Sequence, residues 1–216
     1  MAELAEATGE PRWRRRSDAR PAEIAEAALE LFVEHGFAGT RMEAIARRAG
    51  VTKGTLYLYF PGKEDLFRAV VTQNVLPNLE LIERLAAEHT GSAAELLGLL
   101  VRRSWELMQT SRTRFVPKLL LAEGKNFPEL AKFYVEEVVQ RVRRIFAGVI
   151  ERGIASGEFR EVNAITASKL LLAPLHNLTT WRQSLMAFDP VQWDFDQYVE
   201  LHIEIFLRGL ARNPDR

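Results

Sequence analysis

Residues 40–66 read TRMEAIARRAGVTKGTLYLYFPGKEDL, and this run contains two short helix signals separated by a glycine. Thr40 and Glu43, three residues apart, form a capping box that predicts the start of a short helix. Gly50 breaks that helix, and Thr52 is placed to N-cap a second helix that ends before a Pro-Gly pair. The run therefore predicts two short helices joined by a tight turn.

The spacing within this run is typical of a helix-turn-helix over about residues 41–60. The small side chain of Ala46 lets the two helices approach, while Val51 and Leu56 fix the angle at which they cross. The second helix, expected over residues 53–59, presents its exposed N-terminal residues to a major groove about 12 Å wide. The motif therefore predicts sequence-specific binding to double-stranded DNA.

The residues before the motif divide into a tail and a helix. Apolar residues at helical spacing predict a helix over about residues 21–34. Residues 1–20 contain Pro11 and a WRRR cluster without apolar periodicity, so we expect a flexible basic arm there. Between Arg12 and Lys63, ten basic residues stand against six acidic ones, which makes this part locally positive. Two readings of the arm stay open: a solvated tail, or an arm that adds phosphate or minor-groove contacts.

Helical patterns continue through the rest of the chain. A long helix over about residues 63–87 is expected to kink at Pro77, because proline removes an internal hydrogen bond. Further helices are expected over residues 92–110, 112–123, 127–156, 163–187 and 191–210. The predicted fold is all-α with about nine helices. We expect three parts: the arm at 1–20, a three-helix DNA-binding domain at 21–67, and a larger helical ligand-binding and dimerisation domain at 68–216.

The composition is that of an ordinary soluble globular chain, with 47% hydrophobic and 27% charged residues. The net charge is zero, with 29 basic and 29 acidic side chains, so the total charge does not by itself indicate a nucleic-acid partner. The chain has no cysteine, which excludes disulfides and fits a reducing compartment. Neither a secretion signal nor an apolar stretch long enough to cross a bilayer is visible, so we expect a cytoplasmic protein without a membrane partner.

The run GVTKGTLYLYF at residues 50–60, the PGKEDL that follows it and the upstream AALELFVEHGFAGT resemble the signature of the TetR family of transcriptional regulators. The resemblance covers about residues 20–70 closely, and the remainder is similar in length and helical character only. It implies a DNA-binding regulator, in its simplest form a homodimeric repressor that a small amphipathic or aromatic effector releases from its operator. The resemblance implies no enzymatic activity and no cofactor.

The resemblance also implies which residues contact DNA. Thr40 and Arg41 are expected at the sugar–phosphate backbone, and Lys63 matches the family's phosphate-binding lysine. The residues expected to face DNA on the second helix are Lys53, Gly54, Thr55, Tyr57, Leu58 and Tyr59. Hydroxyl and amine groups suit phosphate oxygens and base edges, and a glycine permits close approach of the backbone. At the position of Tyr59 the family commonly has histidine, so this contact departs from the family pattern.

Simpler readings compete for several of these residues. Phe60 lies four residues after Leu56 on the same helix face, so we expect it in the core. Tyr57 and Tyr59 cannot both share that face. Without the preceding motif, Lys63 would be read as an ordinary solvated helix start, and only the motif favours a phosphate contact.

Aromatic and polar residues of the larger domain are candidates for a ligand cavity between helices. The candidates are Trp105, Met108, Gln109, Phe115, Phe127, Phe133, Tyr134, His176, Asn177, Thr180, Trp181 and Phe188. For each of them a core position is the more common outcome, because apolar residues at helical spacing usually pack inside. The sequence does not identify the effector.

The last two predicted helices are apolar on more than one face, which is more than a monomer core uses. The residues expected in a two-fold four-helix interface are Leu171, Leu175, Leu178, Leu185, Tyr198, Val199, His202 and Phe206. The family resemblance also implies a homodimer. Such a dimer would hold two recognition helices about 34–36 Å apart on a near-palindromic operator.

Two other classes of function fit the sequence less well. The four histidines lie outside any recognised metal-binding spacing, and the chain lacks a cysteine nucleophile and a glycine-rich phosphate loop, so we expect neither an enzyme nor a metal site. A helical adaptor for other proteins would leave Thr55, Tyr57 and Lys63 without a role. A gel shift at several salt concentrations separates the adaptor from a DNA-binding protein, because counterion release makes DNA affinity fall steeply with salt.

Overall fold

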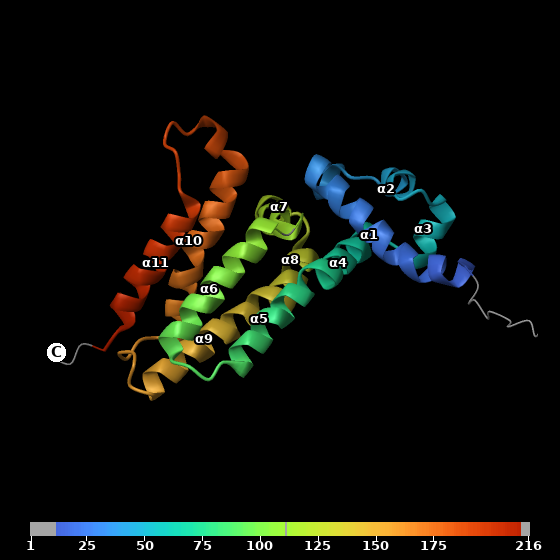
Figure 1. The fold of residues 1–216 in the computed structure, drawn as a ribbon. Coiled ribbons are helices and arrows are strands. Elements are labelled where there is room, and N and C mark those ends of the chain that lie inside the picture. Colours follow the sequence, from blue (N-terminus) through green and yellow to red (C-terminus); the bar gives the residue numbers. More distant parts are fainter. Residues whose placement is uncertain (1–11, 111, 213–216) are drawn as a thin grey trace, which may run out of the picture. The chain divides into compact units, whose positions relative to one another are not determined.

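The computed structural model describes residues 12–110 and 112–212, with the side chains of residues 20–110 and 114–212. In this part of the chain the secondary structure is helical throughout, apart from an isolated bridge between Phe159 and Ala211 (Figure 1). The α-helices are α1 (Arg12–Gly39), α2 (Met42–Arg48), α3 (Lys53–Tyr59), α4 (Lys63–Asn74), α5 (Leu76–Glu88), α6 (Ala93–Thr110), α7 (Val116–Glu123), α8 (Pro128–Tyr134), α9 (Gln140–Ala155), α10 (Ala164–Ser184) and α11 (Phe195–Leu210). Short 3₁₀-helical segments lie at Arg112–Phe115 and Met186–Phe188, and a π-helical segment lies at Val135–Val139.

The all-α prediction is confirmed, and the eleven α-helices of the described residues correspond to the nine expected ones. The difference arises because two predicted helices are each divided: residues 63–87 form α4 and α5, and residues 127–156 form α8 and α9. No described helix is both long enough and apolar enough to cross a membrane.

One prediction near the N-terminus is wrong. The arm expected over residues 1–20 is helical from Arg12, because α1 continues through Pro21, where we expected it to begin. Its segment before Pro21 is rich in arginine, a good helix former, which extends the helix on the N-terminal side of the proline. The expected arm residues 1–11 lie outside the described residues.

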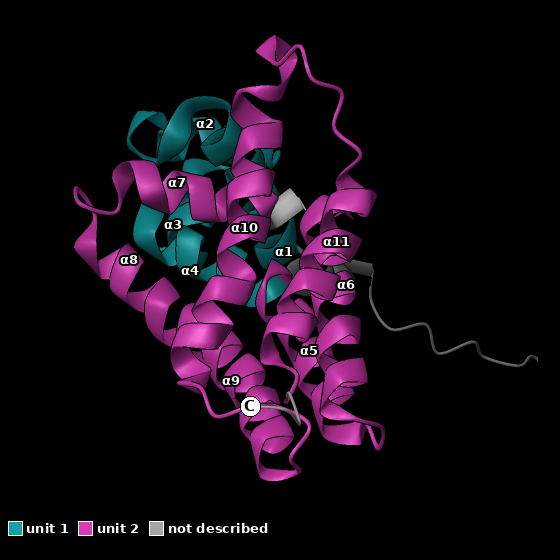
Figure 2. Ribbon diagram, turned by 90° about the vertical axis from the view of Figure 1, so that its left-hand side faces the viewer, with its two compact units in different colours: residues 1–73 teal, residues 74–216 magenta. Residues whose placement is uncertain are grey.

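The chain divides into two compact units, residues 1–73 and 74–216, which Figure 2 shows in different colours. The division falls a few residues after the boundary predicted at 67 and 68. It coincides with the break between α4 and α5, where Val75 stands outside both helices. Pro77 follows two residues later. The sequence predicted a kink at this proline. Because its ring lacks an N–H and crowds the preceding turn, the long helix is instead divided into two here.

Three phenylalanine rings hold the first unit together. Phe32 of α1 lies 5.2 Å from Phe37 and 6.5 Å from Phe67 of α4, measured between ring centroids, and Phe37 lies 6.1 Å from Phe67. Ile45 of α2 and Leu56 of α3 are fully buried in the same unit. Each of the four helices therefore places at least one apolar side chain in this core, which fixes their packing.

Two glycines turn the chain where the helices of this unit end. Gly36 interrupts α1 with φ 74° and ψ 168°, and Gly50 has φ 66° in the turn between α2 and α3. Residues with a Cβ rarely adopt a positive φ, so glycine suits both turns. At Gly50 the amide of Val51 donates to the carbonyl oxygen of Ala46 at 3.0 Å, which closes the end of α2 as a helix-turn-helix requires.

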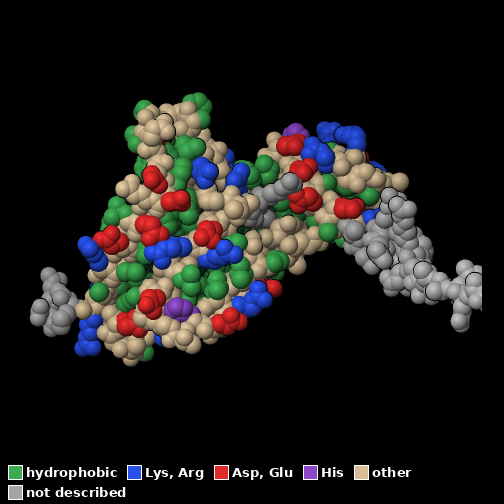
Figure 3. All heavy atoms as spheres, viewed as in Figure 1, with side chains coloured by type: hydrophobic (Ala, Val, Ile, Leu, Met, Phe, Trp, Pro, Cys, Tyr) green, Lys and Arg blue, Asp and Glu red, His purple; other side chains and the backbone are tan. Residues whose placement is uncertain are grey.

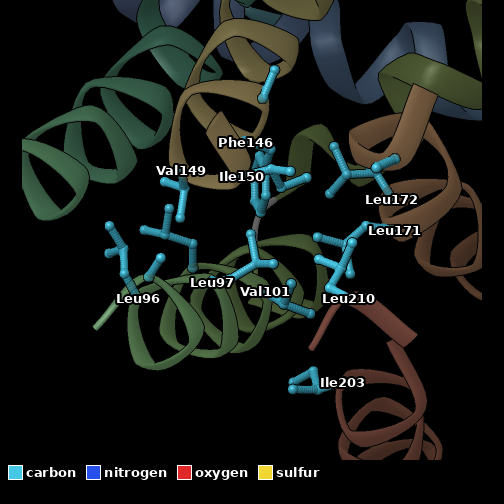
Figure 4. Close-up of a cluster of buried hydrophobic side chains, with 14 of the residues drawn as sticks. Leu96, Leu97, Val101, Phe146, Val149, Ile150, Leu171, Leu172, Ile203 and Leu210 are labelled. Carbon is cyan, nitrogen blue, oxygen red and sulfur yellow. The ribbon is translucent and has the colours of Figure 1, made fainter. Parts of the chain in front are cut away.

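The core of the second unit lies between α6, α9, α10 and α11. Figure 4 shows Leu97 and Val101 of α6 pointing toward Ile150 of α9 and Leu171 of α10. Helix α9 packs against both α6 and α10, and α11 packs against α6. These helices bury a continuous apolar cluster, so the larger unit has its own core.

Four residues predicted for the dimer interface belong to this core instead. Leu171, Leu175, Leu178 and Val199 are buried within the chain, so they are not available to a partner. The three leucines recur at helical spacing and form the inward stripe of α10. Of the other predicted residues, Leu185 is exposed, whereas Tyr198, His202 and Phe206 are half-buried. His202 is also engaged inside the unit, with a ring nitrogen 2.7 Å from the carbonyl oxygen of Leu171.

Different residues of α10 and α11 are apolar and exposed. Ile165 and Leu170 of α10 and Leu201 and Ile205 of α11 are large apolar side chains that are more than half exposed. In addition, the end of α10 and the segment leading to α11 expose a cluster of apolar side chains at their tip, where Figure 3 shows hydrophobic atoms gathered: Leu185, Met186, Phe188, Val191 and Trp193. We call Ile165, Leu170, Leu201 and Ile205 together the outward apolar face.

Candidate DNA-binding site and ligand cavity

Helix α3 is anchored by one side and exposes the other. Leu56 is completely buried, and Phe60, just after the helix, is 8% exposed, which confirms the prediction of a core position for Phe60. Tyr57 is 40% exposed and Leu58 is 80% exposed. Because successive residues of a helix point about 100° apart, burial of Leu56 turns the neighbouring side chains outward.

The start of α3 is held by a side-chain cap. The hydroxyl oxygen of Thr52 accepts a hydrogen bond from the amide of Thr55 at 3.1 Å and lies 2.9 Å from the hydroxyl of Thr55. This cap satisfies one of the amide donors that an α-helix leaves unpaired at its first turn. The expected N-cap is therefore confirmed.

The exposed first turn of α3 carries Lys53 and Gly54. The ammonium of Lys53 lies 2.6 Å from the carboxylate of Glu43 on α2 and 5.7 Å from the ring centroid of Tyr57. The hydrogen bond between Lys53 and Glu43 lowers the pKa of the Glu43 carboxyl and raises the pKa of the Lys53 ammonium. Both side chains are solvent-exposed, so this ion pair orients Lys53 more than it stabilises the fold.

Gly54 leaves open space on the outer surface of α3. A Cβ placed at this position would have only the hydroxyl of Thr52, at 3.9 Å, within contact range. Glycine is a poorer helix former than alanine, by up to about 1 kcal/mol in a helix interior, and Gly54 lies in the first turn of α3. The fold therefore gives no reason for a glycine here, and the position lies on the exposed side of α3.

A second ion-pair system joins α2 to α1. The guanidinium of Arg48 donates to the carboxylates of Glu30 and Glu34, with distances of 2.9 Å to each. The hydrogen bond from Arg48 lowers the pKa of Glu34. This pairing connects α2 to α1 on the surface of the unit, in addition to the buried contact of Ile45.

The role predicted for Thr40 is wrong. Its side chain is 3% exposed, and its hydroxyl lies 3.0 Å from the carbonyl oxygen of Leu31 and 2.6 Å from that of Gly36. Helix α2 instead has Arg41 as its N-cap residue, without a side-chain cap, so the capping box does not form. The interruption of α1 at Gly36 leaves carbonyl groups that need a donor, and the hydroxyl of Thr40 supplies it.

Lys63 is also engaged inside the unit. Its ammonium donates to the carbonyl oxygens of Phe37 at 2.5 Å, Ala38 at 3.2 Å and Thr40 at 3.0 Å, and lies 4.6 Å from the ring centroid of Phe37. A lysine ammonium has three N–H donors, and these three carbonyls use all of them. In the chain without DNA Lys63 therefore has a structural role at the end of α1, and its predicted phosphate contact stays a prediction.

The other residues predicted to contact DNA vary in exposure. Arg41 is exposed at the start of α2, and Thr55 and Tyr59 are half-buried on α3. The structure thus brings together Lys53, Gly54, Tyr57 and Leu58 on one exposed surface of α3. Thr40 is buried away from this surface, and Lys63 is half-buried.

The second unit contains a channel built from two adjoining cavities. An inner cavity of about 190 Å³ lies between α5, α6, α7, α9 and α10, and an outer cavity of about 540 Å³ lies between α7, α8, α9 and α10. Seven residues line both cavities: Pro117, Leu121, Tyr134, Val138, Val142, Leu172 and His176. The shared residues place the two cavities side by side, and we call the pair the channel.

The channel is lined mainly by aliphatic side chains. Tyr134 and His176 are its shared polar groups. Burial raises the pKa of Tyr134 to about 12, so its phenol stays protonated at neutral pH. The ring Nδ1 of His176 lies 2.9 Å from the carbonyl oxygen of Leu172. The inner end is formed by residues at the start of α5, among them Val75 and Leu79.

Four of the predicted pocket residues line this channel: Met108, Tyr134, His176 and Thr180. Trp105 and Gln109 line a different cavity, of about 560 Å³, beside the segment before α11. The other predicted pocket residues line neither the channel nor this different cavity: Phe115, Phe127, Phe133, Asn177, Trp181 and Phe188. The prediction relied on aromatic residues, whereas valines and leucines are the commonest residues of the channel lining, and residue type alone does not distinguish a valine or leucine in a cavity from one in the core.

Comparison with known proteins agrees with both units. The family model of bacterial regulatory proteins of the tetR family matches residues 24–70, and that of the tetracyclin repressor-like C-terminal domain matches residues 87–188. An uncharacterized HTH-type transcriptional regulator, YdeS of Bacillus subtilis, is 32% identical over 152 residues, which are 69% of this chain and 72% of that protein. The chain belongs to the TetR family of transcriptional regulators, and it is a DNA-binding regulator.

Two further proteins are similar over most of the chain. The fatty acid metabolism regulator protein of Bacillus subtilis is 27% identical over 171 residues, which are 78% of this chain and 87% of that protein. The crystal structure of the transcriptional regulator FadR from Bacillus subtilis, in complex with stearoyl-CoA, superposes with a TM-score of 0.68 at 24% identity, covering 88% of this chain and 99% of that one. The second likeness is one of fold.

The engagement of Lys63 leads to a prediction about stability. Replacing it, as Lys63→Met, removes the donor to three carbonyl groups, and we expect the free energy of unfolding to fall by about 1–3 kcal/mol. Urea denaturation followed by circular dichroism measures this change. The exposed Lys132→Met is the matched control. An unchanged urea midpoint together with a uniform loss of DNA affinity would restore the phosphate role of Lys63.

Proposed function

We propose that this chain is a homodimeric transcriptional repressor that binds a near-palindromic operator through α3 and is released by an effector with a long hydrocarbon chain. The observation that carries the proposal is the exposed surface of α3, where Lys53, Gly54, Tyr57 and Leu58 lie together on a helix anchored by Leu56. Membership of a family of DNA-binding regulators supports the same function.

The surface of α3 suits the major groove chemically. Lys53 offers ammonium donors to guanine or phosphate oxygens, Tyr57 offers a hydroxyl, and Leu58 offers an apolar surface to a thymine methyl group. Gly54 lets the DNA backbone or a base edge approach the helix closely. On binding, Lys53 exchanges Glu43 for the nucleic acid, because phosphates and base acceptors compete for the same ammonium.

The outward apolar face of α10 and α11 supports a homodimer. Exposed large apolar side chains at Ile165, Leu170, Leu201 and Ile205 are better accounted for by a partner than by water. A two-fold axis through this face pairs α10 and α11 with their copies, as the sequence predicted, but through different residues. A dimer also supplies the second α3 that a near-palindromic operator needs.

The channel of the second unit is the proposed effector site. Its inner end is lined by Val75 and Leu79 at the start of α5, and α4 ends one residue before Val75. An effector that fills the channel therefore touches the helix that continues, across the break at Val75, into the DNA-binding unit. A coupling free energy of about 1–3 kcal/mol between effector and operator is sufficient for regulation.

The aliphatic lining favours a hydrocarbon chain over the aromatic ligand that the sequence left open. The similar protein named as a fatty acid metabolism regulator supports this choice. Repression rather than activation is supported by the match to the tetracyclin repressor-like C-terminal domain.

The DNA-contact proposal predicts opposite effects of Gly54→Ala on folding and on binding. The added methyl group has room and raises helix propensity, so the urea midpoint stays equal or rises. It also occupies the space that DNA needs, so we expect operator affinity to fall about tenfold or more, equivalent to about 1.4 kcal/mol. The measurement is a gel shift on DNA recovered by selection with purified wild-type protein. Wild-type affinity of the variant would remove Gly54 from the contact surface.

The dimer proposal predicts that Ile205→Lys produces monomers. A lysine on the outward apolar face places a charge in the interface, and a monomer presents a single α3 to the operator. We expect light scattering to report about half of the wild-type mass and the gel shift to weaken strongly. Leu99→Lys, at an exposed apolar position of α6, is the control. If Ile205→Lys keeps the wild-type mass, the interface lies elsewhere.

The effector proposal predicts that a long-chain acyl compound weakens operator binding. With stearoyl-CoA as the probe, we expect the operator Kd to rise by roughly 5- to 150-fold. Ala173→Trp should remove the response and keep operator affinity, because residue 173 is exposed and the new ring fills the outer cavity. Binding of stearoyl-CoA in the channel without any change in operator Kd would refute the switch.

A further inference from the structure

The charges around the channel have one sign. Its lining includes the cations Arg114, Lys118, Arg143 and Lys169, and no aspartate or glutamate lines either cavity. The whole chain has 29 acidic and 29 basic side chains, so a lining with four cations and no carboxylate departs from the average surface. Cations on the rim of an apolar channel attract a ligand that carries negative charge at one end.

The four cations differ in the contacts that they already make within the chain. Arg114 lines the inner cavity, donates to the carbonyl oxygen of Gln109 at 3.0 Å and stacks on the ring of Phe115 at 4.9 Å. Arg143 of α9 and Lys169 of α10 line the outer cavity from two helices and are both exposed. Among the residues that the structure describes, neither of these two pairs with a carboxylate. Lys118 is exposed as well but lines the inner cavity only, so Arg143 and Lys169 are the cations placed to receive an anionic group at the outer cavity.

The channel has the length for a long hydrocarbon chain. Along α10 its lining runs from Ser168, at the outer cavity, to Thr180, at the inner one. Twelve residues of α-helix span about 18 Å. Leu121 lines both cavities and is 81% exposed, so a ligand in the channel would also cover an apolar side chain that otherwise faces water.

We propose that the effector is an amphipathic anion whose head group is bound by Arg143 and Lys169 at the outer cavity, with its hydrocarbon chain directed inward to the start of α5. This assignment rests on the proposed function, and it adds the charge, the orientation and the residues that recognise the head group. A carboxylate of a fatty acid and the phosphates of a fatty acyl-CoA both have the required chemistry.

The test is calorimetric titration of the full chain with three probes of equal chain length: stearate, stearoyl-CoA and uncharged stearyl alcohol. We expect Arg143→Gln combined with Lys169→Gln to weaken binding of an anionic probe roughly ten- to hundredfold, the equivalent of losing charge-assisted hydrogen bonds. Binding of stearyl alcohol should stay as in the wild type. If the double variant loses affinity for both stearate and stearoyl-CoA, a carboxylate is sufficient for recognition at this site. If the wild type binds stearoyl-CoA alone of the two anions, and the double variant loses that binding, the site recognises the phosphates.

Two controls make the assignment specific. Arg144→Gln combined with Lys132→Gln removes the same charges from exposed positions that line neither cavity, and should leave all three affinities unchanged. Lys118→Gln should have the smaller effect, since Lys118 lines only the inner cavity. If Lys118→Gln is the substitution that removes anion binding, the proposed orientation is wrong.

Equal affinity of the wild type for stearate, stearoyl-CoA and stearyl alcohol would overturn the proposal, as would wild-type anion binding by the Arg143 and Lys169 double variant. A parallel gel shift of the ligand-free double variant separates this failure from failure of the proposed function. Operator binding that persists while the preference for an anion is absent rejects the head-group site alone, because DNA contact by α3 does not involve these residues.

Discussion

Burial of Leu56 is the constraint on which the functional reading depends. Helix α3 has only seven residues, and Leu56 is the residue it buries. Once that side chain is inside, helical geometry leaves no freedom over which residues face outward, and Lys53, Gly54 and Tyr57 come to the surface. Phe60 adds a second anchor just after the helix. The DNA-contact surface is therefore a consequence of core packing, and the cap of Thr52 fixes where the helix begins.

The polar residues around α3 hold the scaffold in place. Lys63 and Thr40 donate to carbonyl groups near the interrupted end of α1, which brings the start of α4 to the end of the first helix. Arg48 ties α2 to α1 from the surface. In the second unit a comparable division of roles appears between the buried leucines of α10, which form the core, and the exposed cations Arg143 and Lys169.

The sequence predicted the features that depend on interactions between residues close together in the chain, and it missed those that depend on contacts between distant segments. The helix-turn-helix and the anchors Leu56 and Phe60 depend on spacing along the chain, and these predictions were correct, whereas the start of α1 and the capping box of α2 were not. Thr40 was misassigned, and the carbonyl contacts of Lys63 were not foreseen, because these carbonyls come from a neighbouring segment and a pattern of residue types does not show which partner a side chain takes. Without the structure a capping threonine and a phosphate-binding lysine look the same as a buried threonine and a helix-capping lysine.

The channel and the dimer face were the least predictable parts. The sequence showed that α10 and α11 have too many apolar residues for one stripe, but it did not show that Leu171 faces the core while Leu170 faces outward. For the channel, aromatic residues were chosen, whereas aliphatic residues from six helices line it. Whether a valine lines a cavity or lies in the core depends on how helices that are distant in the sequence pack together. The periodicity of the sequence carries no information about that packing.

The most direct test of the account is photo-crosslinking to operator DNA from single positions of the first unit. A photoreactive phenylalanine analogue at position 57 lies on the exposed surface of α3, and the same analogue at position 33 lies on an exposed part of α1. The account predicts a crosslink to operator DNA from position 57 and none from position 33. Crosslinking from position 33 with none from position 57 would show that α3 does not face the DNA, and would contradict the account.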